Sequence, residues 1–189
     1  MNTPISFFLL SLHAACSACG QATFQLNNRI VGTLDAPIFS QFNSKAAGTE
    51  YVVGLFGGPA GTPESALTLQ GTTLTFRTGA GAGYINTTGV DTTRRVAGTT
   101  DGGTAAVQLR AWASRFGTDA AGYTAAWAAG LAGKSTLLTL TGGGGLLTPA
   151  PLVGLQSFNA YFWPEPSVGA LLMLGAGVLG LRRRKPAPE

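Results

Sequence analysis

Apolar and polar residues alternate in short runs through most of the chain, which is the pattern of β-strands with one buried face. The clearest run is 104–112, where odd positions carry only Ala, Val and Leu and even positions include Gln108, Arg110 and Trp112. Similar runs, most of them bounded by Gly or Pro, predict further strands at 23–27, 50–56, 73–77, 135–141 and 152–158.

One segment departs from this alternation. Residues 119–132 are rich in Ala, and Tyr123 and Trp127 lie four positions apart, which predicts a short helix ended by Gly130 and Gly133. Residues 142–151 contain a Gly run and two prolines and predict a long loop. Together these elements predict one mainly β domain at 23–160, an antiparallel β-sandwich of jelly-roll or immunoglobulin-like type with one short helix.

The N-terminus predicts a secretory signal peptide over residues 1–22. Residues 5–18 are mostly apolar, as in the central region of such a leader. Small residues at Ala18 and Gly20, or at Gly20 and Ala22, fit a cleavage site, so the mature chain begins near Gln21 or Thr23. The alternative is a lipoprotein leader, with a lipid attached to one of the two cysteines at positions 16 and 19.

The C-terminus combines a helix breaker, an apolar run and a basic end. Pro164 and Pro166 cannot lie inside a helix, whereas residues 167–181 are apolar all round and predict a membrane-spanning helix with the domain outside the cytoplasm. These 15 residues span about 22 Å, and snorkelling cations and local bilayer thinning narrow the gap to the roughly 30 Å hydrocarbon core. A buried core helix is the alternative, but four adjacent cations oppose it. They form the predicted membrane stop, Arg182, Arg183, Arg184 and Lys185.

The segment 161–189 resembles a PEP-CTERM sorting domain. The resemblance rests on Pro164-Glu165-Pro166-Ser167, the Gly-containing apolar helix and the Arg-rich end, in that order. It implies a bacterial exported protein whose tail is processed near Pro164, Glu165 and Pro166 by a membrane enzyme of the exosortase type. It also implies transient anchoring in the inner membrane, then location at the cell surface or in an extracellular matrix with exopolysaccharide.

Composition narrows the chemistry of the exported part. Both cysteines and the single histidine lie in the predicted leader, so 21–163 contains no Cys, His or Met. Disulfides, zinc, haem and iron–sulfur sites, and His-dependent nucleophilic catalysis therefore lack their usual residues there. The same span holds eight basic and six acidic residues, without the basic stripe of a nucleic-acid binder. We therefore expect no enzyme activity, no cofactor, no metal and no nucleic-acid partner.

Aromatic residues give the one candidate binding site. Trp112 and Trp127 are the predicted carbohydrate contacts, because aromatic rings on a β-sandwich stack on sugars. The alternative is that both fill the core. Tyr161, Phe162 and Trp163 are predicted to lie at the membrane interface.

Three further motifs are assigned to turns. Asp91, Asp101 and Asp119 fall in predicted loops, where a glycosidase pair or a calcium site are the alternatives to solvated turns. Residues 128–135 fit a permissive phosphate-loop pattern, but the predicted order is helix then strand, the reverse of what phosphate binding needs. The sequon at 86–88 is interpreted as a surface turn.

Overall fold

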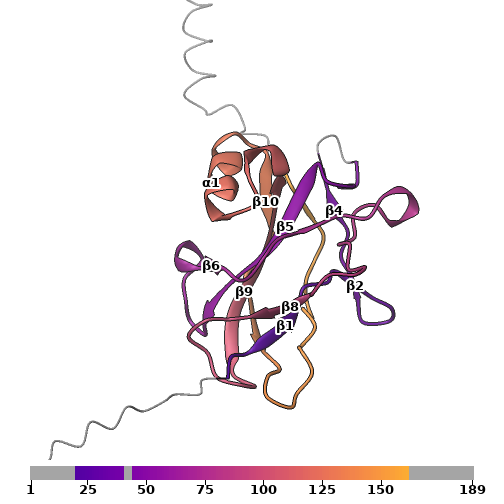
Figure 1. Cartoon of the computed structure of the whole chain (residues 1–189). Helices are drawn as coiled ribbons and strands as arrows, with labels where there is room; N and C mark the ends of the chain where they lie inside the picture. The colour runs from indigo at the N-terminus through magenta and orange to yellow at the C-terminus, as the bar shows by residue number, and fades with distance from the viewer. Residues whose placement is uncertain (1–19, 41–43, 162–189) are drawn as a thin grey trace, which may run out of the picture.

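The computed structural model describes residues 20–40 and 44–161 (Figure 1). Strands make up 37% of the structure and one α-helix is present in this part, which confirms the predicted mainly β fold. The predicted leader up to residue 19, the sorting motif at 164–166, the apolar helix at 167–181 and the basic stop at 182–185 lie outside the described residues.

Two long antiparallel strands form the centre of the fold. Strand β5 (Tyr51–Pro59) pairs with β9 (Thr104–Ala113) along its whole length, from Tyr51 opposite Ala113 to Pro59 opposite Ala105. Both match strands predicted from the sequence. Four short strands extend the pair into a six-stranded sheet: β6 (Thr68–Leu69) and β7 (Leu74–Thr75) on β5, and β10 (Ala132–Lys134) and β11 (Leu138–Thr141) on β9.

Three two-stranded sheets complete the β structure of the described residues. They are β1 (Thr23–Gln25) with β8 (Thr93–Arg95), β2 (Arg29–Ile30) with β3 (Leu34–Asp35), and β4 (Ile38–Phe39) with β12 (Phe158–Asn159). The β4–β12 pair is parallel, so the prediction of a wholly antiparallel fold is wrong at this pair. The predicted strand at 152–158 is also wrong: Gly154 has φ +88° in a turn, and only Phe158 joins a strand.

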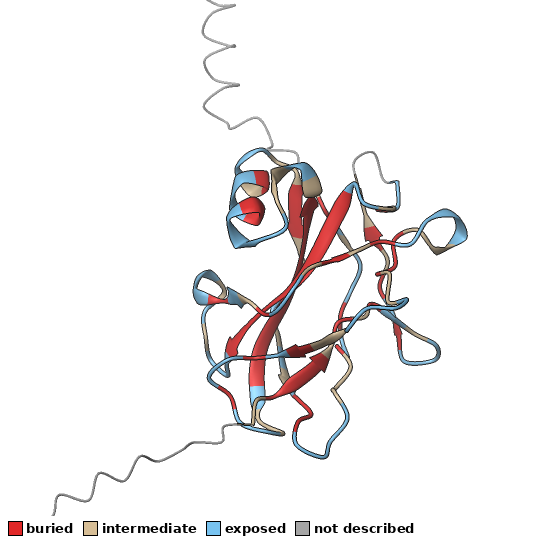
Figure 2. Ribbon diagram, in the orientation of Figure 1, coloured by how far each residue is buried: buried red, intermediate tan, exposed pale blue. Residues whose placement is uncertain are grey.

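The two faces of the β5–β9 pair are both buried (Figure 2). Odd positions of β9, including Val107 and Leu109, join a hydrophobic core with residues of the small sheets such as Phe24 and Ile38. Even positions, including Trp112, form a second core with the helix. This division confirms the two faces predicted for 104–112.

The helix α1 (Ala120–Ala128) confirms the predicted helical segment but ends earlier. Asp119 is its N-cap, and the side chain of Asp119 accepts a hydrogen bond of 2.8 Å from the backbone N of Gly122. Gly130 follows with φ +72°, whereas Gly133, the second predicted helix end, lies inside β10. Short 3₁₀ turns occur at Glu64–Ala66, Gly79–Gly81 and Ser114–Phe116. Within residues 20–40 and 44–161, no helix is both long and apolar enough to cross a bilayer.

The described chain begins and ends at opposite ends of the central strands (Figure 1). Its start lies near the end of β5 and the beginning of β9, because Gly20 contacts Asp101 and β9 begins at Thr104. Its last strand, β12, lies beside β10, which pairs with the final residues of β9. The two predicted targeting segments therefore join the domain at opposite ends.

Candidate functional site

The densest group of polar and aromatic side chains lies between α1 and the even-numbered face of β9. We call it the aromatic–polar cluster. It draws on β5, β9, α1, β10 and the turn at Glu64–Ala66, and its members are Phe56, Glu64, Gln108, Arg110, Trp112, Tyr123, Trp127, Lys134 and Ser135.

Three buried rings form the floor of the cluster. Trp112 makes edge-on contacts with Phe56 and with Tyr123, at centroid distances of 6.4 Å and 5.5 Å, and Phe56 and Tyr123 are 5.4 Å apart. The indole N–H of Trp112 donates to the Gly117 carbonyl at 2.7 Å, which satisfies its one polar atom. Gly54 on β5 leaves room for Leu69 beside these rings, because a Cβ at Gly54 would lie only 2.6 Å from Leu69 Cδ1.

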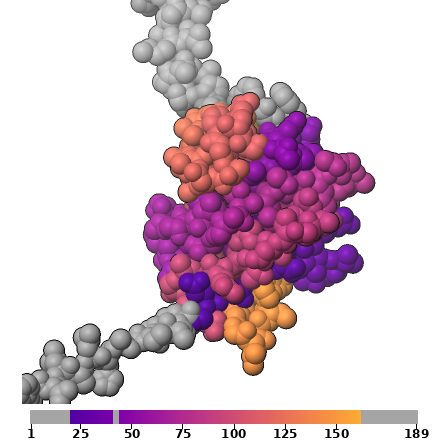
Figure 3. Space-filling model, viewed as in Figure 1, coloured from indigo at the N-terminus to yellow at the C-terminus, as the bar shows by residue number. Residues whose placement is uncertain are grey.

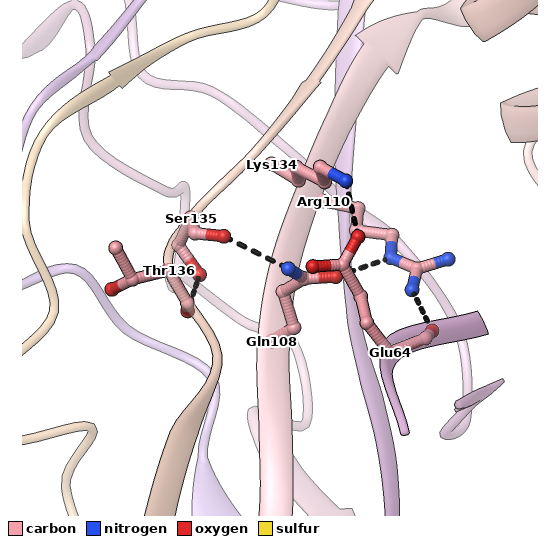
Figure 4. A network of polar contacts seen from close by, with 6 residues as sticks. All are labelled: Glu64, Gln108, Arg110, Lys134, Ser135 and Thr136. Carbon is pink, nitrogen blue, oxygen red and sulfur yellow. Dashed lines mark hydrogen bonds and ion pairs between the residues drawn. The ribbon is translucent and has the colours of Figure 1, made fainter. Parts of the chain in front are cut away.

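Arg110 lies on this aromatic floor as a buried cation, and Figure 4 shows its contacts with Gln108 and Glu64. Its guanidinium carbon is 4.2 Å from the centroid of Phe56 and 5.0 Å from that of Tyr123. Its Nε donates to Gln108 Oε1 at 2.8 Å, and its Nη2 donates to the Glu64 carbonyl at 2.8 Å. Burial lowers the pKa of Arg110, but the group keeps its charge because arginine begins from so high a value.

The remaining polar atoms continue this network toward β10. Gln108 Nε2 donates to the Ser135 carbonyl at 2.9 Å. The Ser135 hydroxyl accepts from the Leu109 backbone N at 3.1 Å and donates to the Thr136 carbonyl at 2.8 Å. Gln108, Arg110 and Ser135 thus all have protein partners, so this part of the cluster is a structural network.

The rim of the cluster is partly exposed and charged. Lys134 and Glu64 form an ion pair there, with 35% and 40% of their side chains exposed. The hydrogen bond from Lys134 lowers the pKa of Glu64, and burial opposes that shift. Lys134 Nζ also lies 4.9 Å from the ring centroid of Trp127, which is half-buried and 5.9 Å from Tyr123. The rim is where a ligand could reach the cluster.

The structure separates the two tryptophans predicted to bind carbohydrate. Trp112 has no exposed surface, so it cannot stack on a sugar, and the prediction is corrected at this position. It fills the core instead, as the alternative interpretation stated. Trp127 keeps part of its surface exposed and stays a candidate contact.

The three predicted loop aspartates occupy different places. Asp119 caps α1, and Asp91 accepts from the Thr93 backbone N at 2.8 Å, a bond that lowers the pKa of Asp91. Asp101 lies beside the start of the described chain. Among the residues that the structure describes, no three or more His, Cys, Asp or Glu side chains form a group that could hold a metal.

Sequence reasoning missed the network around Arg110. The alternation in β9 placed Gln108 and Arg110 on the face of Trp112, which was a signal that they would be buried together. Glu64 carried no such signal, because its contact with Lys134 joins residues 70 positions apart. The segment 133–135 was assigned to a turn after the helix, and that assignment is wrong: Gly133 and Lys134 lie in β10 and Ser135 follows it.

Comparisons with known protein families, with curated proteins and with solved structures found no match for this chain. The resemblance of the C-terminal segment to PEP-CTERM sorting domains therefore stays a prediction.

Proposed function

We propose that this chain is an exported, non-catalytic protein of the cell surface or extracellular matrix, delivered by a signal peptide and sorted by its C-terminal segment. Its partners are the membrane and an exosortase-type processing enzyme, which acts near Pro164, Glu165 and Pro166. Arg182, Arg183, Arg184 and Lys185 form the cytoplasmic stop. The finer description of the domain as a jelly-roll or immunoglobulin-like sandwich belongs to the same proposal.

The observation that carries the proposal is where the folded domain begins and ends. Ala22 and Ala160 both have no exposed surface, so the buried core includes the last residue of the leader predicted at 1–22 and ends directly before the sorting segment predicted at 161–189. Ala160 is held by its backbone N, which donates to the Phe39 carbonyl at 2.6 Å. A folded body that fills the interval between a leader and a sorting tail supports the interpretation as a cargo protein.

The short connection after Ala160 has a geometric consequence. Only three residues separate Ala160 from Pro164, and they span about 10 Å when extended. In the anchored precursor, the end of the domain near β12 and β10 is therefore held close to the bilayer. The opposite end, where the described chain begins, is held away from it.

The test is replacement of the three motif residues. A chain carrying Pro164→Ala, Glu165→Ala and Pro166→Ala should remain full length at its C-terminus and stay in the membrane fraction, because the processing site loses its extended conformation. Intact-mass analysis of material from a host that carries the sorting enzyme measures this directly.

The chain supplies its own matched control. Pro186 and Pro188 form a second Pro-x-Pro sequence beyond the basic stop, so Pro186→Ala with Pro188→Ala changes the same residue types outside the motif. The control should be processed like the unaltered chain. An unchanged mature mass in the triple variant would reject the proposal.

A second candidate function, binding of exopolysaccharide, is favoured by the rim of the aromatic–polar cluster. There the partly exposed ring of Trp127 lies beside the Glu64–Lys134 pair, and sugars are bound by such combinations of an aromatic face and charged hydrogen-bonding groups. Affinity electrophoresis in gels containing the exopolysaccharide should show retardation that Trp127→Ala abolishes. Thr124→Ala, on an exposed position of the same helix, is the control and should leave mobility unchanged. Equal mobility of all three proteins excludes this function.

A further inference from the structure

The first residues of the described chain decide between the two predicted leader cleavage sites. Ala22 is fully buried, and both of its backbone groups are engaged. Its N donates to the Thr99 hydroxyl at 2.8 Å, and its carbonyl accepts from the Val96 N at 2.9 Å. Its Cβ also packs closely on Gly142, where an added Cβ would lie only 2.7 Å away. Ala22 is therefore part of the folded domain.

Cleavage after Ala22 would remove this residue and create an ammonium at Thr23. Thr23 is only 7% exposed, and its backbone N donates to the Gly143 carbonyl at 3.0 Å in the folded domain. A charged terminus at this depth is costly, because a buried charge needs compensation. Gln21, by contrast, is partly exposed and can carry a charged amine.

A carboxylate lies at the point where an amine on Gln21 would appear. The Asp101 side chain lies so close to the Cα of Gly20 that an added Cβ on Gly20 would overlap it. Bond lengths then place the carboxylate within about 5 Å of the Gln21 backbone N. Within residues 20–40 and 44–161, Asp101 forms neither an ion pair nor a side-chain hydrogen bond.

The surroundings of Asp101 form a shallow pocket at the end of the domain where the described chain begins. Figure 3 shows this indigo start beside the orange loop. The pocket has a volume of about 490 Å³, and its charged members are Asp101 and Arg95. Gly144 lets the loop backbone approach, because an added Cβ there would overlap Asp101 and lie 2.8 Å from the Gln21 carbonyl.

We propose that the leader is removed by hydrolysis of the peptide bond between Gly20 and Gln21, and that the new ammonium of Gln21 pairs with Asp101. The oxygen of a water molecule becomes part of the new Gly20 carboxylate. Both protons of that water end on the Gln21 nitrogen, which becomes the ammonium. Ala18 and Gly20 then provide the small residues that such cleavage needs. This inference rests on the proposed export of the chain.

The first experiment maps the N-terminus of the full chain after export, by intact mass and N-terminal sequencing. We expect the mature protein to begin at Gln21 with a free amine. A start at Thr23, or a lipid on either cysteine, overturns the inference but leaves export intact. Retention of Met1 in a chain that never leaves the cytoplasm overturns export itself. A Gln21 that has cyclised with loss of ammonia overturns the ion pair.

The second experiment tests the pair by combining two changes. In the processed protein, Asp101→Asn should lower the Tm by about 2–4 °C at pH 7 and low salt. Ala18→Leu blocks cleavage by enlarging a residue that must be small, so Gln21 stays within an amide and carries no charge. In that uncleaved protein, Asp101→Asn should leave the Tm unchanged.

The pH dependence separates the ion pair from other roles of Asp101. The α-amine loses its proton near pH 8, so the effect of Asp101→Asn should disappear between about pH 8 and pH 10 in the processed protein. Arg95 is the other charged group that faces the pocket. An effect of the same size in cleaved and uncleaved proteins, or at pH 7 and pH 10, overturns the pairing.

Discussion

The two faces of β9 are both buried, but they differ in the kinds of side chain that they bury. The odd face packs aliphatic side chains such as Val107 and Leu109 against the small sheets, and it contains little besides carbon. The even face buries Gln108 and Arg110 beside Trp112, and each of their polar contacts has a specific partner. The same ten residues thus contribute both to a core that needs only volume and to one that needs defined geometry.

This difference has an energetic consequence. A hydrophobic core tolerates substitutions that keep its volume. In a buried polar network, a group left without its hydrogen-bond partner destabilises the fold by the full cost of its desolvation. The even face should therefore be more sensitive to substitutions that keep size but remove hydrogen bonds. It is also the face that reaches solvent, through the Glu64–Lys134 pair.

The largest effect should come from Trp112→Ala, which removes a fully buried ring and should lower the free energy of unfolding by about 3–5 kcal/mol. Leu109→Ala on the odd face is the matched change, with an expected loss of about 2–5 kcal/mol. Because Trp112 contacts Tyr123 and holds Gly117, its loss should also loosen α1.

Hydrogen exchange distinguishes the two variants. Trp112→Ala should speed exchange in 120–128 more than in β5, whereas Leu109→Ala should lower protection throughout the sheet without a preference for the helix. Equal patterns in the two variants would mean that the two faces unfold as one unit, and the proposed difference between them would be lost.

The sequence predicted the two faces well because alternation is a local property. Residues 104–112 carry their own pattern, and the strand, its faces and the presence of a helix after it were predicted correctly, although the helix ends earlier than predicted. The prediction from the sequence failed where a strand depends on pairing with residues far away in the chain. Phe158 and Asn159 form β12 only because Ile38 and Phe39 lie beside them. Residues 152–157 have the pattern of a strand but lack such a partner in the described structure.

The candidate site was predicted less completely for a related reason. A tryptophan in a sequence can be a core residue or a contact surface, and only its neighbours in space decide. Trp112 proved to be core because α1 covers it, whereas Trp127 lies at the margin of that cover. One partner of Arg110, Gln108, lies in β9 itself, but the other lies in the turn at Glu64. The sequence around Arg110 gives no indication of this second partner.

The second prediction concerns the polar network itself. Gln108→Leu keeps roughly the volume but leaves Arg110 Nε and the Ser135 carbonyl without their partner, and it should cost about 1–3 kcal/mol of unfolding free energy. Adding Arg110→Met should not add the full single-mutant cost, because it removes the unpaired donor. Urea unfolding of the three variants measures this coupling. Strict additivity would show that Gln108 and Arg110 contribute independently.

The third prediction concerns the ionisation of Tyr123 and its effect on stability at alkaline pH. Burial raises the pKa of Tyr123 to about 12, and the nearby Arg110 cation only partly opposes this. The folded state therefore holds the phenolic proton more tightly than the unfolded state, whose pKa is near 10. This contribution is complete below pH 10, is lost as the pH rises toward 12, and amounts to about 1 kcal/mol at pH 11. Tyr123→Phe should flatten this part of the stability profile, and an unchanged slope in that variant would contradict the assignment.

The smallest effect should come from the rim. Lys134→Met removes the ion pair with Glu64 but keeps the aliphatic chain beside Trp127, and the exposed pair should contribute at most about 1 kcal/mol. The hydrogen bond from Lys134 lowers the pKa of Glu64 below its ordinary value of 4.5, so the contribution is present above that value and is lost as the pH falls through the lowered one. Urea unfolding at pH 7 and pH 3 should therefore show a smaller difference in stability between the variant and the unaltered chain at pH 3 than at pH 7. A difference of the same size at both pH values would assign the effect to the contact between Lys134 and Trp127, so that the rim, like the aromatic floor, would depend on packing against a ring and not on the ion pair.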